Sequence, residues 1–468
     1  MNPGIQEFRD QLIPRVPAFY YDTGKKEYLV KQNEGENVRE WITLSETQMT
    51  RVLALAGIRS VKGKEETMSP VANMLCDASM SSEKSVHYSG PLAGYKEGLV
   101  CIGGTRMLIT TSPRILVPKE GEFPLIRTVV EGLLGETGGI QLPFFYAWLK
   151  LSYLALREGD TRGMPAVAMV GPKNCGKTFV QQHLITPILG GRMARPHNFM
   201  TGLTNFNADL FAAEHLAMGD ESPSTDLRAR RRFGAYIKNF VAEESQQLHA
   251  KFCDARTTRP FWRVTISLND EAENVLTLPP IDDSISDKLM ILGAKIFDFP
   301  MRVVLPEEKK AFAAAFAAEI PAFLDWLVKM PVDESILDQR FTVFAYHCPR
   351  ILAMLTEVSP EYRLAELIKM CYFTEGSDDI RFTTRAVKMD IEMTALELER
   401  GLTSDDSPVY HEARDLLKGG GRKLVTYLGR LSQKFPEHVT QLRSSSSRKW
   451  RIRGIDKILG SIGSQGLD

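Results

Sequence analysis

The stretch at residues 171–178, GPKNCGKT, fits the pattern G-x-x-x-x-G-K-[ST] at every specified position. A short apolar run with the composition of a buried strand precedes it at 166–170, and residues 179–185 favour a helix. Strand, glycine-rich loop and helix in this order predict a phosphate-binding loop, because the backbone N–H groups and the helix dipole then face the anion. The alternative is a glycine-containing turn that opens an ordinary helix.

The predicted loop supplies eight nucleotide-binding residues. Lys177 is expected to reach the terminal phosphates, and Thr178 is expected to ligate magnesium. Cys175 occupies a variable position of the pattern, so we interpret it as tolerated rather than catalytic. The set is Gly171, Pro172, Lys173, Asn174, Cys175, Gly176, Lys177 and Thr178.

The composition indicates a soluble protein of several domains. A chain of 468 residues exceeds one ordinary core, and its apolar share of 43% suits globular folding. Lys plus Arg equals Asp plus Glu at 58 each, so any surface that attracts nucleic acid must be local. The sequence shows no apolar run that suits a bilayer span, and its six scattered cysteines lack zinc spacing. We expect a cytoplasmic protein without a membrane partner.

The patterns predict an α/β chain built around a parallel sheet. Helical periodicity covers 123–134, 143–157 and 387–399, and a basic strand pair closes the chain. The expected division is an α+β region of unknown role at 1–120, a helical segment at 121–160, the P-loop core at 161–305, a helical segment at 306–375 and a winged helix at 380–460.

Two later strands end in polar residues that suit phosphoanhydride hydrolysis. Residues 215–219 lead into Asp220 and Glu221, and residues 263–268 lead into Asn269. Hydrolysis needs one carboxylate to hold hydrated magnesium and another to orient and deprotonate the attacking water. We assign these tasks to Asp220 and Glu221, and we expect Asn269 to sense the γ-phosphate. Alone, the strand end at Asp220 and Glu221 would be interpreted as a surface turn, and a strand-end turn is the alternative interpretation at Asn269.

Together these elements resemble the superfamily 3 helicases, the AAA+ ATPase module of phage, plasmid and large-virus primase-helicases and replication initiators. The resemblance covers about residues 85–375 and is strongest at 166–300. The family carries a further hairpin that grips single-stranded DNA in the channel of a hexameric ring. His249 and Lys251 stand in that place, and a compact cation on phosphate gives the sequence-blind grip that a motor needs.

The resemblance also implies a basic residue that reaches the nucleotide of the neighbouring subunit. The family usually has Asp-Arg where this chain has Asp287 and Lys288, and lysine lacks the bidentate fork of arginine. Either Lys288 serves, or the role passes to the arginine run at 228–232, with Arg231 as the candidate. Such a run is otherwise a solvated face, and we leave both interpretations open.

The basic cluster near the C-terminus surrounds a single aromatic residue, Trp450. Lys449 and Arg451 flank it, after a run of four serines at 444–447 that suits a flexible turn. This is typical of a wing that lies along the backbone of a DNA duplex. Docking of a protein partner is the competing interpretation.

The sequence thus predicts a hexameric, ATP- and Mg²⁺-dependent DNA helicase or replication motor of mobile-element type that moves on single-stranded DNA. One alternative is an initiator or loader that uses ATP as a switch and does not unwind DNA. Another is a structural or defence protein in which nucleotide only stabilises an oligomer.

Overall fold

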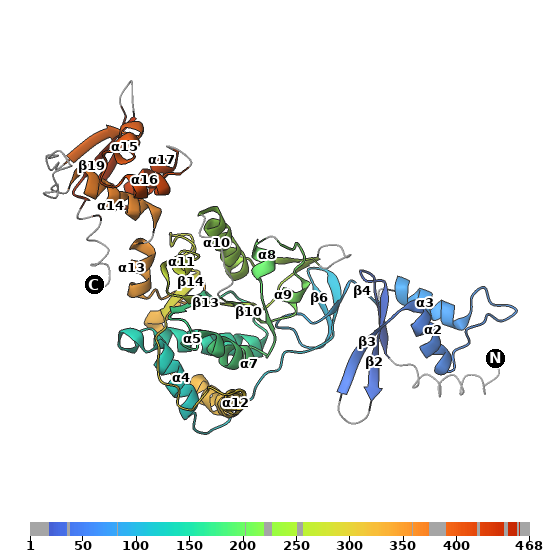
Figure 1. Ribbon diagram of the computed structural model, residues 1–468. Coiled ribbons are helices and arrows are strands. Elements are labelled where there is room, and N and C mark those ends of the chain that lie inside the picture. The colour runs from blue at the N-terminus through green and yellow to red at the C-terminus, as the bar shows by residue number, and fades with distance from the viewer. Residues whose placement is uncertain are drawn as a thin grey trace.

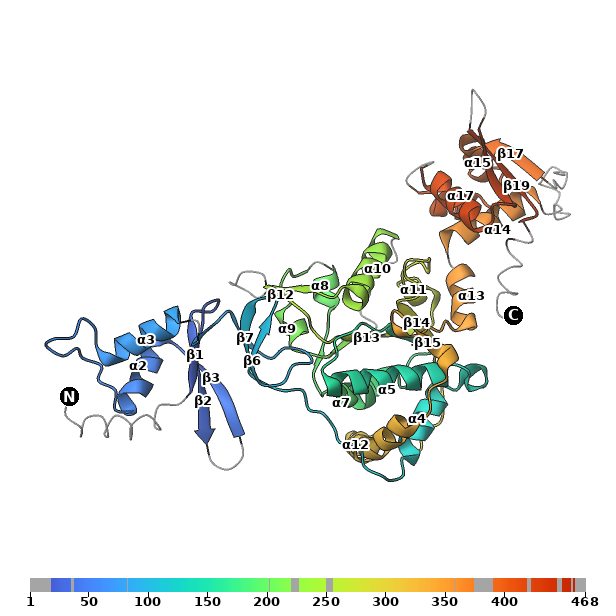
Figure 2. The same cartoon turned by 180° about the vertical axis from the view of Figure 1, so that it is seen from behind.

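The computed structural model describes residues 18–34, 38–81, 83–201, 203–219, 227–249, 256–357, 359–373, 390–418, 422–443, 448–455 and 458. Its described parts lie in a row, with the N-terminal sheets at one end, a large α/β body in the middle and the C-terminal helices and strands at the other end (Figures 1 and 2).

The N-terminal part begins with a four-stranded sheet in the order β3-β2-β1-β4. Residues 19–22 and 27–34 form an antiparallel hairpin, and a capping box of Ser45 and Gln48 starts the first described helix. The elements are β1 (Phe19–Asp22), β2 (Glu27–Glu34), β3 (Val38–Leu44), α2 (Glu46–Leu55), α3 (Pro70–Met80) and β4 (Ser85–Val86).

A second small sheet joins this part to the central body. It contains β5 (Tyr88–Gly90), β6 (Gly98–Ile102) and β7 (Thr105–Ile109), with β7 between the other two. The loop after β5 is anchored in the body, because Ala93 donates its N–H to the carbonyl of Phe211 at 2.7 Å and accepts from the N–H of Phe261 at 3.0 Å.

The central body is built on a five-stranded sheet in the order β14-β8-β13-β10-β9, in which every pairing is parallel. The expected parallel sheet is therefore confirmed. Because the strands run the same way, their carboxyl ends share one edge of the sheet, where ligands bind in such folds. The strands are β8 (Ala166–Gly171), β9 (Met193–Ala194), β10 (His215–Met218), β13 (Arg263–Asn269) and β14 (Leu289–Gly293).

Helices cover both faces of this sheet, so its strands are apolar on both sides. In β8, Val167 and Met169 belong to the core of one face, and Ala166, Ala168 and Val170 belong to the core of the other. The first face is covered by α4 (Pro124–Leu134), α5 (Leu142–Glu158), α7 (Thr186–Ile188) and α12 (Pro306–Lys329). The second is covered by α8 (His197–Thr201), α9 (Ala208–Phe211), α10 (Leu227–Ala242), α11 (Ala272–Val275) and α13 (Pro349–Glu357).

Helix α12 is, among the described residues, the one helix long and apolar enough to cross a membrane by length and composition. Its large apolar side chains instead pack into the core of the first sheet face, including Phe312, Phe316, Phe323 and Leu327. That packing is typical of a core helix in a soluble protein.

The C-terminal part has its own apolar core and a three-stranded antiparallel sheet in the order β17-β19-β18. The predicted basic strand pair is present, but the helix expected over 387–399 is wrong for 390–394, which form a strand. Thr394 forms a capping box with Glu397, so the helix begins only after it. The elements are α14 (Pro360–Tyr372), β17 (Asp390–Thr394), α15 (Ala395–Leu402), α16 (Tyr410–Leu416), α17 (Arg422–Lys434), β18 (Val439–Arg443) and β19 (Arg448–Arg453).

Candidate nucleotide site

The glycine-rich loop joins the carboxyl end of β8 to helix α6 (Lys177–Val180). Two of its glycines are required by geometry. A Cβ on Gly171 would lie 2.2 Å from the carbonyl oxygen of Ala294, and Gly176 has a φ of 105°, which side-chain-bearing residues rarely adopt. The turn at Gly176 starts the helix, and the first N–H groups of a helix have no partner within it.

Lys177 is held inside this loop. Its side chain is buried, and Nζ donates to the carbonyl oxygens of Gly171 and Pro172, at 2.7 Å each. Nζ also lies 3.3 Å from Oδ1 of Asn269, which ends the neighbouring strand β13. The structure therefore brings together two predicted site residues that are far apart in the sequence, because Gly171 and Asn269 are paired in the parallel sheet.

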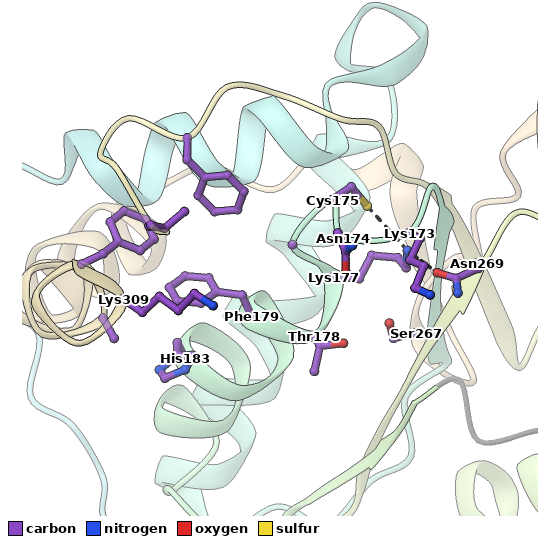
Figure 3. A pocket seen from close by; sticks show the side chains of 15 residues that line it. Lys173, Asn174, Cys175, Lys177, Thr178, Phe179, His183, Ser267, Asn269 and Lys309 are labelled. Carbon is purple, nitrogen blue, oxygen red and sulfur yellow. Dashed lines mark hydrogen bonds between the residues drawn. The ribbon is translucent and has the colours of Figure 1, made fainter. Parts of the chain in front are cut away.

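A cavity of about 690 Å³ opens beside the loop. At one end Lys177, Thr178, Ser267 and Asn269 provide an ammonium, two hydroxyls and an amide (Figure 3). Such a donor set suits phosphate and a hydrated magnesium ion. The lining residues are Lys173, Asn174, Cys175, Gly176, Lys177, Thr178, Phe179, His183, Ser267, Asn269, Phe299, Val303, Lys309, Phe312 and Ala313.

Asp220 and Glu221 lie outside the described residues, but the strand that leads to them is placed. Strand β10 lies beside β13, with Met218 opposite Ile266. Gln181, one turn after Thr178, donates from Nε2 to the carbonyl of Met218 at 3.2 Å and to Oγ1 of Thr265 at 2.8 Å. The end of β10 is therefore tied to the helix that follows the glycine-rich loop.

The predicted DNA-contacting hairpin has two paired strands, β11 (Gln246–Leu248) and β12 (Arg256–Thr258). His249 lies just beyond β11, where its N–H donates to Oδ1 of Asn207 at 2.7 Å and its ring lies 5.5 Å from that of Phe206. Lys251 lies outside the described residues.

The two candidates for the residue that acts on a neighbouring subunit differ in their surroundings. Lys288 is buried, with Nζ 2.6 Å from Oδ1 of Asp287 and 5.1 Å from the ring centre of Phe341. Arg231 belongs to α10, and its side chain is not among those described. Its neighbour Arg230 points inward, because Nε donates to the carbonyl of Leu278 at 2.8 Å.

Lys449 and Arg451 lie on β19, the central strand of the C-terminal sheet. The buried Trp450 and Ile452 alternate with them, so both basic side chains belong to the other face of the sheet. Arg451 is paired with Glu392 on the neighbouring strand, whereas Lys449 is exposed.

Sequence reasoning missed several residues that line the cavity. Ser267 lies two residues before Asn269, on the same strand, and alternation along that strand could have identified it. Phe299, Val303, Lys309 and Phe312 come from a segment more than a hundred residues after the glycine-rich loop, and no local pattern marks them.

Comparisons with known proteins support the fold. Residues 169–284 match a family of unknown function (DUF5906), and no curated protein matches the chain. The apo structure of the NrS-1 C-terminal region matches with 13% identity and a TM-score of 0.52, over 95% of this chain and 97% of that one. A second apo structure of that region has the same identity and score. The active helicase Cch of SCCmec type IV matches over 95% of this chain and 94% of that one, with 8% identity; its TM-score of 0.39 is too low to support an inference.

Proposed function

We propose that this chain is an ATP-dependent DNA helicase or replication motor of mobile-element type, cytoplasmic, that moves on single-stranded DNA as a homo-hexamer. The observation that carries the proposal is the meeting of Lys177 and Asn269, 3.3 Å apart, at one end of a cavity lined by the glycine-rich loop. A buried lysine whose ammonium is held at the carboxyl end of the parallel sheet, beside a glycine-rich turn, suits a bound phosphate and is not needed for the docking of a protein partner alone.

In this proposal the chain's own groups position the triphosphate. The N–H groups at the start of α6 bind phosphate oxygens, and Lys177 exchanges its carbonyl partners for the terminal phosphates. Thr178 and Asp220 hold magnesium, which neutralises charge on the phosphates when bound. Glu221 accepts the proton of the attacking water, and Asn269 orients the γ-phosphate.

The remaining predicted residues couple hydrolysis to DNA. The β11–β12 hairpin carries His249 and Lys251 toward the strand, and Lys449 and Arg451 lie along a duplex. In the ring, a basic residue of one subunit completes the site of the next. Lys288 is already paired with Asp287, so we favour the arginine run with Arg231 for this role. We also propose that the chain divides into domains near residues 120, 160, 305 and 375.

Matched assays of ATP hydrolysis and strand displacement on forked DNA test the proposal. Lys177→Ala and Asp220→Ala are expected to abolish both, and Glu221→Gln is expected to bind ATP and stall. Normal hydrolysis by Lys177→Ala would remove the basis of the proposal. ATP hydrolysis that DNA stimulates, without strand displacement, would favour an initiator or loader that does not unwind DNA. Full function of Glu221→Gln would favour a structural protein in which nucleotide only stabilises an oligomer.

A further inference from the structure

The cavity beside the glycine-rich loop extends well beyond the space that phosphates need. Its far end is lined by Phe179 and His183 from the helix after the loop, by Phe299 and Val303, and by Lys309, Phe312 and Ala313 from the start of α12. Figure 3 shows His183 and Lys309 at this end and Lys177 and Asn269 at the other. The apolar end is therefore continuous with the phosphate end.

Residues 294–305, which we term the strap, run from β14 to α12 over the glycine-rich loop. The strap is anchored at its start, where Ala294 donates its N–H to the carbonyl of Val170 at 2.7 Å. A Cβ on Gly176 would lie 3.2 Å from the ring of Phe299. The strap thus packs on the loop, and from there Phe299 reaches the lining of the far end, where its ring centre lies 5.8 Å from that of Phe312.

The helix after the loop adds an aromatic pair to the far end. The rings of Phe179 and His183 stack with centres 4.6 Å apart and planes 27° apart. The two residues are four positions apart, a spacing at which side chains of a helix meet. Residues 181–185 form a π-helical turn, η3 (Gln181–Ile185), a local widening that often occurs at functional sites. Burial lowers the pKa of His183, so its imidazole is neutral near pH 7 and suited to stacking.

We propose that the far end of the cavity binds the base of the nucleotide by stacking, between Phe299 of the strap and the Phe179–His183 pair, with Lys309 at its rim. This inference rests on the proposed function, since it places the base of the same nucleotide whose phosphates the glycine-rich loop holds. Aromatic faces can stack on any base, so the affinity that this end contributes comes from ring overlap and not from hydrogen bonds to the base edge.

Calorimetric titration of the full chain with Mg²⁺-ADP and with Mg²⁺-tripolyphosphate, which has no base, tests this assignment. Wild type is expected to bind ADP more tightly than tripolyphosphate. His183→Ala and Phe299→Ala are expected to weaken ADP at least about fivefold and leave tripolyphosphate within about twofold. Phe312 is in the buried core and is left unchanged, because its loss would disturb folding.

Two matched controls lie on the same elements. Ile296 is 68% exposed on the strap and does not line the cavity, and Lys310 is the exposed neighbour of Lys309. Ile296→Ala and Lys310→Ala should bind both ligands as wild type does, whereas Lys309→Ala should weaken ADP. Equal loss of both ligands in His183→Ala and Phe299→Ala, or no loss of ADP, would overturn the base site alone. Wild-type affinity of Lys177→Ala for both ligands would instead overturn the phosphate site and the proposed function.

Discussion

Asn269 Oδ1 lies 3.3 Å from Nζ of Lys177, across a separation of 92 positions in the sequence. The contact follows from the sheet, because β8 and β13 are parallel neighbours and Gly171 is opposite Asn269. An amide at this position can hold the lysine while the site is empty of phosphate and can then turn toward the γ-phosphate. Asn269 is thus expected to contribute more to the rate of ATP hydrolysis than to the affinity for nucleotide.

Asn269→Ala should lower the rate of ATP hydrolysis about 100-fold, as loss of one preorganised polar group does in other enzymes. ADP affinity should change less than about threefold, because the loop and Lys177 remain. Steady-state ATPase assays and calorimetry check both expectations. Asn274→Ala is the control, since the Asn274 amide is already bonded to Glu271. Parallel loss of ADP binding and hydrolysis would show that Asn269 only supports the loop.

The hairpin gives a prediction about DNA. Lys251→Ala should weaken binding of single-stranded DNA and abolish strand displacement, while ATP hydrolysis without DNA stays normal. If Lys251 contacts one phosphate, the slope of log affinity against log salt concentration should fall by about 0.7. Fluorescence anisotropy titrations of labelled single-stranded DNA at several salt concentrations measure this slope. Lys62→Ala, at an exposed N-terminal site, should leave the slope unchanged. An unchanged slope in Lys251→Ala would assign the grip to other residues.

The two basic residues of β19 should differ in their effect on duplex binding. Lys449 is exposed, whereas Arg451 is paired with Glu392 and lies 3.8 Å from Asp390. An arginine that already satisfies a carboxylate gains less from a phosphate. Lys449→Ala should therefore reduce duplex affinity more than Arg451→Ala does, as gel-shift titrations of the full chain can measure. If neither variant changes duplex affinity, the sheet face is better explained by a protein partner.

Short stretches of sequence were sufficient to predict the elements that surround the candidate site. The glycine-rich loop, its flanking strand and helix, and the strand that ends at Asn269 follow from spacing and apolar runs. The burial of Lys288 and Arg230 could not be predicted, because the ring of Phe341, which covers Lys288, and the carbonyl of Leu278, which accepts from Arg230, are placed by tertiary packing. The strand at 390–394 was mistaken for a helix because it runs directly into the capped helix that follows.

The strap and the far end of the cavity show the same limit more strongly. Phe299 and Lys309 meet Phe179 and His183 only because β14 lies beside β8 and leads the chain back over the loop. In the sequence, Phe299 belongs to a short aromatic segment after a strand, and Lys309 belongs to a charged stretch at the start of a helix. Their shared cavity is a property of sheet order, which no local window contains.

His215 gives a prediction about acid stability. Its ring is fully buried between two hydroxyls, with Thr186 Oγ1 2.7 Å from Nδ1 and Thr265 Oγ1 2.7 Å from Nε2. Burial lowers its pKa from 6.5 to about 3, so the folded state keeps the ring neutral while the unfolded state takes up a proton as the pH falls. Stability from this group is therefore present above about pH 6.5 and is lost progressively as the pH falls toward 3.

Because the pKa of His215 is lower in the folded state than in the unfolded state, the free energy of unfolding should fall by about 2 kcal/mol between pH 7 and pH 5. His215→Gln has no group that titrates at this position, so its free energy of unfolding should fall by about 2 kcal/mol less over the same range. The variant should be less stable than wild type at pH 7, because it loses at least one of the two short hydrogen bonds. Urea unfolding at several pH values measures both effects. His411→Gln, at an exposed position, should follow the wild-type curve. Parallel pH dependence of His215→Gln and wild type would mean that His215 does not titrate differently in the folded and unfolded states.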